Sequence, residues 1–269
     1  PIMGTQERKV RQRQEREDRI LDVALRMLVE SGYPGLTMDR VAESIEYSKG
    51  TVYQHFSCKE DIIAGVLCRT EEYETRVMEY AFTLSDCPRE QLTAISLCLD
   101  VFHMMYPGVS NQQLLYSDLH IWNKADPRRR DELNEAIAVK IETGRALIEK
   151  AIGRKELDPA RHQPADVLHG IILVSMGRWE MMRIGSCHEH GPAETHMKEL
   201  FSGDVWPYLR TLQAFMDGLR WRPCSDEHDY DAFARGIFAA IPQRLPELVP
   251  FPAWHVAANR LLIGEPHAV

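Results

Sequence analysis

The chain has 269 residues, of which 44% are hydrophobic and 27% charged, a composition typical of a globular protein large enough for two packed cores. No apolar run approaches the length of a membrane span, and the polar N-terminus lacks the apolar segment of a secretory signal. The six cysteines are scattered without a C-x-x-C pair, which favours reduced thiols over a disulfide framework. We therefore expect a cytoplasmic protein without membrane segments.

The net charge of −8 is distributed unevenly along the chain. Residues 1–59 carry ten basic and nine acidic side chains, a balance of +1, whereas the remainder carries 22 and 31, a balance of −9. The basic excess is greatest in the sequence RKVRQRQER at residues 8–16. A slightly basic N-terminal segment followed by an acidic remainder is the charge distribution expected when only the N-terminal segment binds nucleic-acid phosphate.

The first predicted helix is marked by apolar residues that recur at helical spacing, namely Ile20, Val23, Ala24, Met27 and Leu28. Gly32 follows them, at a position where a left-handed helix end favours glycine. Thr37 then stands at the N-cap of a short helix that continues to about Ile45.

Two further helix starts follow within twenty residues. Ser48 is the expected N-cap of a very short third helix that ends at His55 or Phe56. Residues 57–60 read Ser-Cys-Lys-Glu, which is the S-x-x-E pattern of a capping box. We expect this box to open a long helix that runs to about Ala81.

The rest of the chain consists of helical patterns separated by proline and glycine, at residues 89–106, 111–123, 128–153, 163–185 and 205–219. The proline-bearing tail beyond Pro223 predicts one or two further short helices. We find no convincing β-strand alternation and no internal repeat. The predicted fold class is therefore all-α.

The third helix is too short to be stable alone, because helix nucleation is costly. Val52 and Phe56 lie four residues apart and can anchor it against the preceding helices. Gly50 lets the backbone approach a large partner closely. The polar and aromatic residues left off the core can bind phosphate oxygens or base edges, and they are Ser48, Lys49, Thr51, Tyr53, Gln54 and His55. Residues 37–56 thus have the layout of a helix-turn-helix whose third helix reads the major groove.

The stretch ILDVALRMLVESGYPGLTMDRVAESIEYSKGTVYQHFSCKEDII at residues 20–63 resembles the DNA-binding domain of the tetracycline-repressor (TetR) family. The resemblance covers residues 15 to about 75, and YLRTLQAFMDGLRWRP at 208–223 is more loosely similar to the last dimerisation helix of that family. It implies a flexible basic arm at 1–14, a DNA-binding domain at 15–75, an effector-binding and dimerisation domain at 76–222 and a helical extension at 223–269.

The resemblance also implies roles for individual residues. Thr37, Tyr53 and Lys59 would bind phosphate, and the reading surface would consist of Ser48, Lys49, Gly50, Thr51, Gln54 and His55. One departure is Glu46, which stands where the family usually has glycine in the turn. A residue other than glycine at positive φ costs free energy, and a carboxylate near DNA is unfavourable. Either Glu46 faces away or the turn is altered.

Some of these residues have a second interpretation. Tyr53 and His55 could be ordinary packing residues of an amphipathic helix. The arginine-rich residues 8–16 could be a solvated leader or an arm that binds the minor groove or phosphate. Cys58 beside Lys59 could be a thiolate sensor or simply a small residue at a helix start.

Aromatic and methionine side chains of the body are candidates to line a pocket for a small apolar effector, and they are Phe102, Met104, Met105, Tyr106, Tyr116, Trp122, Met176 and Trp179. Polar handles in such a pocket could come from His103, His120 and His169. The same residue types at helical spacing also form plain core, so both interpretations stay open.

Two kinds of chemistry are not predicted. The sequence SCHEHGPAETH at 186–196 contains possible zinc or copper ligands in Cys187, His188, His190 and His196. Their spacing matches no closed metal site, so we predict no metal. Without a G-x-S-x-G, H-E-x-x-H or Walker motif, we also expect no enzyme.

We therefore expect a transcriptional regulator, most simply a repressor, that binds an inverted-repeat double-stranded operator as a homodimer and responds to a small molecule. Helices near 163–185 and 205–219 would form the dimer interface. The competing interpretation is a DNA-bound adaptor without an effector, whose acidic body and 223–269 extension bind another protein. An activator role also stays open, because groove docking does not set the sign of regulation.

Overall fold

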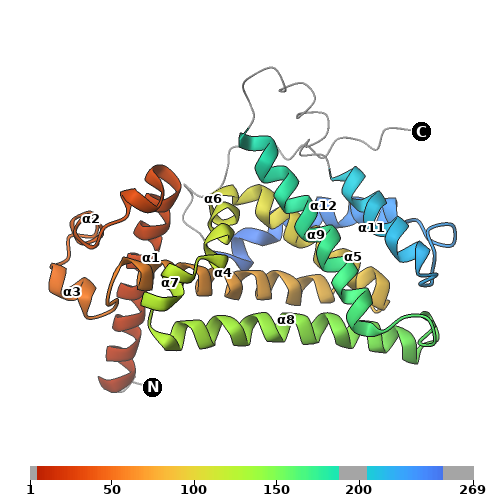
Figure 1. Cartoon of the computed structure of the whole chain (residues 1–269), viewed down its shortest axis with the longest axis horizontal. Coiled ribbons are helices and arrows are strands. Elements are labelled where there is room, and N and C mark those ends of the chain that lie inside the picture. Colours follow the sequence, from red (N-terminus) through yellow and green to blue (C-terminus); the bar gives the residue numbers. More distant parts are fainter. Residues whose placement is uncertain (1–4, 188–204, 251–269) are drawn as a thin grey trace. The chain divides into compact units, whose positions relative to one another are not determined.

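The computed structural model describes residues 5–187 and 205–250, and every regular element within those ranges is a helix (Figure 1). This confirms the predicted all-α fold class. None of the described helices combines the length and the apolar character that crossing a membrane requires.

The N-terminal helices are α1 (Thr5–Gly35), α2 (Met38–Ser44), α3 (Lys49–Tyr53) and α4 (Lys59–Phe82). Residues 5–14, expected as part of a flexible arm, instead continue α1 as exposed helix. Gly32 interrupts α1 with φ 63° and ψ −173°, a conformation that only glycine adopts readily. The helical periodicity of the sequence therefore ends where predicted, and the following residues resume helical geometry after the kink.

The remaining elements are α5 (Pro88–Met105), α6 (Pro107–Ser110), the 3-10 helix η1 (Asn111–Ser117), α7 (Leu119–Lys124), α8 (Pro127–Gly153), α9 (Pro164–Cys187), α11 (Trp206–Gly218) and α12 (Tyr230–Leu248). The helix expected at 111–123 is thus divided into η1 and α7. In the tail as far as residue 250, where the description ends, the helix α12 has 19 residues and is longer than the short helices expected, although it contains Pro242 and Pro246.

The chain divides into two compact units. The first contains the described residues up to Glu72 together with residues 107–137, and the second contains residues 73–106 and the described residues from Ala138 onward. The first boundary lies close to the expected one near residue 75. The sequence did not indicate that residues 107–137 return to the N-terminal unit.

The second unit is organised around α5, which is buried along almost its whole length. α12 packs against α5, and both α9 and α11 contact α5 as well. The guanidinium of Arg89 on α5 is fully buried, and it donates to the Gln213 side chain at 2.8 Å and to the Asp217 carboxylate at 2.7 Å, both on α11. The C-terminal extension, as far as α12, is therefore an integral part of this core.

Candidate DNA-binding surface

Side-chain caps begin the two helices of the predicted helix-turn-helix. The Arg40 backbone N–H donates to the Thr37 hydroxyl at 3.2 Å, and the Thr51 N–H donates to the Ser48 hydroxyl at 3.1 Å. These bonds confirm both predicted N-caps. Glu46, in the turn between the helices, has φ 56° and an exposed side chain. The turn therefore keeps the left-handed geometry normally given to glycine, at the cost that a side chain brings there.

α3 presents one buried side and one exposed side. Val52 and Phe56 are buried, as predicted for anchors of so short a helix. On the other side the residues predicted to meet DNA lie together, with Tyr53 54% exposed, Thr51 half-buried and the rest exposed, namely Ser48, Lys49, Gly50 and Gln54. The exposed side of α3 thus carries hydroxyl, amide and ammonium groups, while the buried Val52 and Phe56 hold the helix in place.

His55 does not belong to that exposed set. Its side chain is only 4% exposed, and its Nδ1 lies 3.6 Å from a carboxylate oxygen of Glu17 on α1. Burial lowers the pKa of His55, partly opposed by the Glu17 carboxylate. The expectation that His55 reads bases is therefore corrected, because its imidazole points into the first unit rather than out of it.

Glu17 also belongs to a buried group of charged residues, Glu17, Arg129 and Asp61, which we call the buried charge chain. Arg129, near the start of α8, donates to Glu17 at 2.9 Å and to Asp61 of α4 at 3.0 Å. Its guanidinium also lies over the Phe56 ring, 4.5 Å from the centroid. Arg129 therefore connects α1, α4 and the residue that anchors the end of α3. No local pattern marks such a residue, because its partners are 68 and 112 positions away.

The predicted capping box at the start of α4 uses a different carboxylate. The Ser57 backbone N–H donates to Asp61 at 2.9 Å, so Asp61 closes the turn and the assignment to Glu60 is corrected. Glu60 instead accepts a hydrogen bond from the Tyr33 hydroxyl at 2.7 Å. Burial opposes ionisation of Glu60, but the hydrogen bonds from Tyr33 and Lys124 outweigh it and lower its pKa to about 2.

Two lysines of the predicted surface are already engaged within the protein. The Lys59 ammonium lies 3.8 Å from the centroid of the Tyr33 ring. The Lys49 ammonium lies 2.6 Å from the Asp39 carboxylate of α2, and this hydrogen bond raises the pKa of Lys49. Cys58, beside Lys59, is half-buried and its thiol lies 3.5 Å from the Lys124 carbonyl oxygen.

The residues predicted to line an effector pocket do not form one group. Tyr116 and Trp122 belong to the first unit, where the Trp122 indole N–H donates to the Tyr116 carbonyl at 2.9 Å. In the second unit, Phe102 and Tyr106 are buried with ring centroids 5.4 Å apart. Met176 on α9 is instead 57% exposed. Met104, Met105 and Trp179 are half-buried in the second unit.

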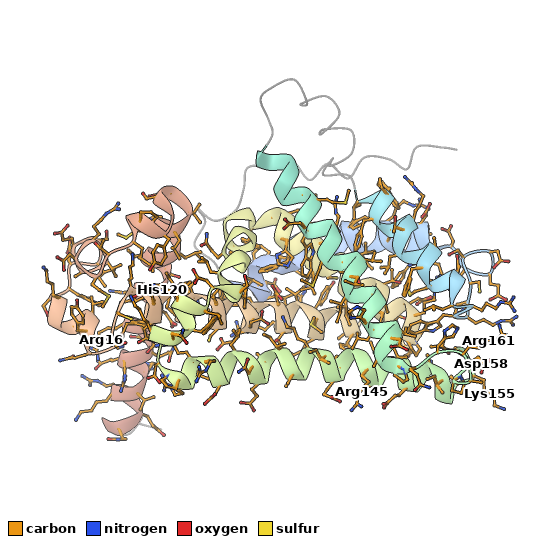
Figure 2. The ribbon with its side chains drawn as sticks, viewed as in Figure 1. Arg16, His120, Arg145, Lys155, Asp158 and Arg161 are labelled. Carbon is orange, nitrogen blue, oxygen red and sulfur yellow. The ribbon has the colours of Figure 1, made fainter. Side chains whose placement is uncertain are left out.

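The three histidines considered as polar groups of such a pocket do not lie together either. His103 of the second unit is buried, with its ring centroid 4.5 Å from that of Trp179. His169 is exposed on α9. His120, labelled in Figure 2, belongs to the first unit and lies 3.4 Å from the Glu60 carboxylate.

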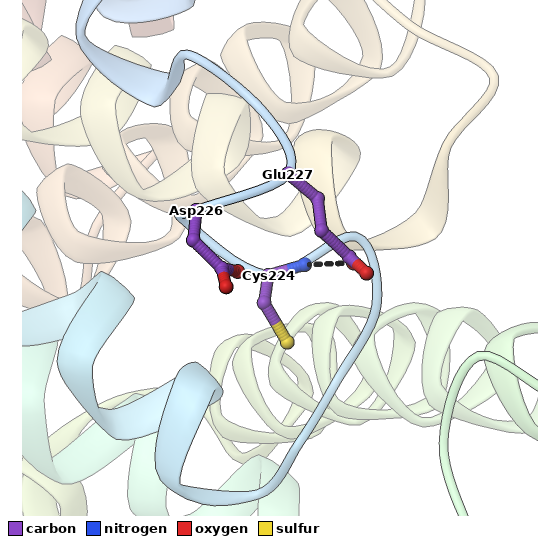
Figure 3. A group of neighbouring side chains, drawn as sticks. All are labelled: Cys224, Asp226 and Glu227. Atoms are coloured by element: carbon purple, nitrogen blue, oxygen red, sulfur yellow. Dashed lines mark hydrogen bonds between the residues drawn. The ribbon is translucent and has the colours of Figure 1, made fainter.

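Hollows in the described part of the second unit lie elsewhere. One of about 610 Å³ lies between α11 and residues 225–231, and another of about 400 Å³ adjoins residues 152–159. Neither is lined by a predicted effector residue. Asp226 and Glu227, which line the first hollow, and the neighbouring Cys224 place possible metal-ligand atoms within 4.8 Å of one another (Figure 3). Glu227 accepts from the Cys224 backbone N–H at 2.9 Å, so its carboxylate already has a structural role in this loop.

The possible metal ligands at 186–196 lie outside the residues whose side chains the structure describes.

Comparison with known proteins shows what the N-terminal helices are similar to. The family model of bacterial regulatory proteins of the tetR family matches residues 20–66. The HTH-type transcriptional regulator TtgW of Pseudomonas putida is 28% identical over 106 residues, which are 39% of this chain and 76% of that protein. IcaR of Staphylococcus aureus, a negative regulator of the biofilm operon icaADBC, is 39% identical over 46 residues, which are 17% of this chain and only 25% of that protein.

Solved structures share the fold at lower identity. A regulator from Saccharomonospora viridis, solved with choline, superimposes with a TM-score of 0.52 at 19% identity, covering 76% of this chain and 96% of that one. A TetR-family regulator from Mesorhizobium loti gives a TM-score of 0.50 at 17% identity, covering 77% and 97%. Residues 20–66, which contain most of α1 together with the capped helices α2 and α3, therefore match the tetR family of bacterial regulatory proteins.

Proposed function

We propose that this regulator is a repressor that binds an inverted-repeat operator as a homodimer and releases it when a small apolar molecule binds the second unit. The observation that carries the proposal is the exposed side of α3, where hydroxyl, amide and ammonium groups converge on a base fixed by Val52 and Phe56. Repression is supported by the likeness to IcaR, which is a negative regulator.

The residues of the candidate surface divide by the DNA atoms they suit. Hydroxyl and ammonium groups at the edge of the surface suit phosphate oxygens, and they belong to Thr37, Tyr53 and Lys59. Groups at the centre suit base edges, and they belong to Ser48, Lys49, Thr51 and Gln54. Gly50 leaves room for the backbone to approach the groove. His55 has no part in this contact, because its imidazole is buried.

The homodimer is supported by an apolar stripe on α9. Ile172, Leu173 and Met176 are all exposed, the last two by 56% and 57%, and they share one face of the helix. Three large apolar side chains that face water along one helix are typical of an interface. We therefore assign Met176 to the dimer interface rather than to an effector pocket. The α3 helices of two protomers related by a two-fold axis would enter successive major grooves roughly 34–36 Å apart.

The effector site is proposed around Phe102, His103, Tyr106 and Trp179, whose rings contact one another in the second unit. The indole Nε1 of Trp179 is buried and donates to no group of the residues that the structure describes. An apolar molecule with one hydrogen-bond acceptor would satisfy that donor, since buried polar groups favour a partner. The effect of this molecule on DNA binding cannot exceed the difference between its affinities for the DNA-binding and DNA-releasing conformations of the protein.

The test is selection of bound duplexes from a random pool, at about 0.15 M salt, by wild type and Tyr53→Phe. Tyr80→Phe serves as the control, because Tyr80 is a half-buried tyrosine of the second unit. We expect a palindromic consensus that Tyr53→Phe binds more weakly and Tyr80→Phe binds like wild type. Weak binding without any consensus would contradict the proposal and would favour the adaptor interpretation, in which a protein partner supplies the specificity.

A further inference from the structure

The helix-turn-helix itself has little electrostatic attraction for DNA. Residues 37–56 contain three acidic residues, Asp39, Glu43 and Glu46, and two basic ones, Arg40 and Lys49, a balance of −1. Arg40 donates to the Gly35 carbonyl, and Lys49 pairs with Asp39. Both cations of the reading segment are thus held by the protein. Since phosphate neutralisation supplies most non-specific affinity, this segment adds little to it.

The pair between Asp39 and Lys49 lies on the surface that would meet DNA. The carboxylate comes from the first turn of α2 and the ammonium from the first residue of α3, with a distance of 2.6 Å between Nζ and Oδ2. Their side chains are 54% and 62% exposed, so both reach solvent rather than the core. An exposed pair adds little to folding stability. Its position therefore bears on DNA binding more than on the fold.

We infer that Asp39 is a specificity-determining residue, which holds the Lys49 ammonium toward a base edge and away from phosphate. This inference rests on the function proposed above. A lysine that donates one N–H to Asp39 keeps two for acceptors in the groove. Guanine offers two adjacent acceptors in the major groove, O6 and N7, whereas adenine and thymine each offer only one there, N7 and O4. Where the operator base is absent, a phosphate group has to compete with the Asp39 carboxylate for the Lys49 ammonium. The negative charge of Asp39 also repels that phosphate.

The experiment measures the binding of two duplexes of equal length and composition, the selected operator and a scrambled version, over about 50–200 mM salt. The variants are Asp39→Asn, Lys49→Met and the double variant. Glu43→Gln is the matched control, because Glu43 is an exposed carboxylate on the same helix that forms no ion pair with Lys49 in the structure. Circular dichroism melting checks that each variant remains folded.

For Asp39→Asn we expect tighter binding to the scrambled duplex, with a salt slope steeper by up to about 0.9 for each phosphate that Lys49 gains. The ratio of operator to scrambled affinity should fall roughly tenfold per half-site, which is the discrimination that a directed lysine–base contact supplies. Glu43→Gln should leave the ratio near the wild-type value. In the Lys49→Met background, Asp39→Asn should have no further effect on the ratio.

Equal effects of Asp39→Asn and Glu43→Gln would overturn the inference, because Asp39 would then act only as one negative charge among others. An unchanged ratio, or an effect that persists without Lys49, would overturn it as well. Failure of the proposed function would be seen separately, in a wild-type protein that binds both duplexes equally.

Discussion

Replacement of Arg129 by methionine tests whether the buried charge chain holds the DNA-binding unit together. Methionine keeps much of the apolar stem but removes the guanidinium that bonds Glu17 and Asp61 at 2.9 and 3.0 Å. Two carboxylates then remain in a site where Asp61 is almost inaccessible to water. Breaking a buried pair from one side costs about 3–5 kcal/mol, because the remaining charge is left without a partner.

The lower part of that range is the better expectation for Arg129→Met. Asp61 keeps its hydrogen bonds from the backbone N–H groups of Ser57 and Asp126, and Glu17 retains some contact with solvent. We therefore expect a loss of about 3 kcal/mol, which corresponds to a fall of roughly 150-fold in hydrogen-exchange protection. Hydrogen exchange reads the amides of α3 and α4 directly, so it remains informative if the two units unfold separately.

The matched control is Arg145→Met, on the same helix α8 (Figure 2). Arg145 is exposed and pairs with Glu142, its neighbour on the same helix, at 2.6 Å. This change should leave the protection of α3 and α4 unaltered. If Arg129→Met lowered protection no more than Arg145→Met, the buried chain would have no energetic role and the reasoning would be refuted. Addition of Asp61→Asn to Arg129→Met should recover part of the loss, because it removes one of the stranded charges.

Three further outcomes are expected. Glu60→Gln should lower the free energy of unfolding by at most about 3 kcal/mol near neutral pH, because the pKa of Glu60 is lower in the folded state than its ordinary value of 4.5. In urea titrations the difference from wild type should disappear as the pH falls from 4.5 toward about 2, the pKa of Glu60 in the folded protein, and a difference that stays constant over that range would contradict the assigned cause. Leu173→Glu should yield monomers in sedimentation and lose operator binding, whereas Leu119→Glu, at a residue 73% exposed in the first unit, should remain dimeric; a dimeric Leu173→Glu would exclude the α9 interface. Tyr53→Phe should weaken operator binding about fivefold in anisotropy titrations, the value of one lost hydrogen bond, and equal affinity would remove its phosphate role.

Features that depend on neighbours within a few residues could be predicted from the amino-acid sequence alone. The N-caps at Thr37 and Ser48, the apolar spacing of α1 and the glycine at position 32 all act within one or two turns, and each appears where predicted. The same local pattern placed Val52 and Phe56 inside and Tyr53 outside. These features suffice for the match of residues 20–66 to the tetR family model, because that match rests on a short run of local signals.

The direction in which several polar side chains point depends on contacts between distant segments, which the folded protein alone reveals. His55 follows the exposed Tyr53 and Gln54 in sequence, yet its imidazole turns toward Glu17, 38 positions earlier. The choice between Glu60 and Asp61 at the α4 cap likewise depends on Tyr33 and Arg129, which engage the two carboxylates from distant segments. A buried charge takes the partner that folding brings within hydrogen-bond distance, and its spacing along the chain does not record that distance.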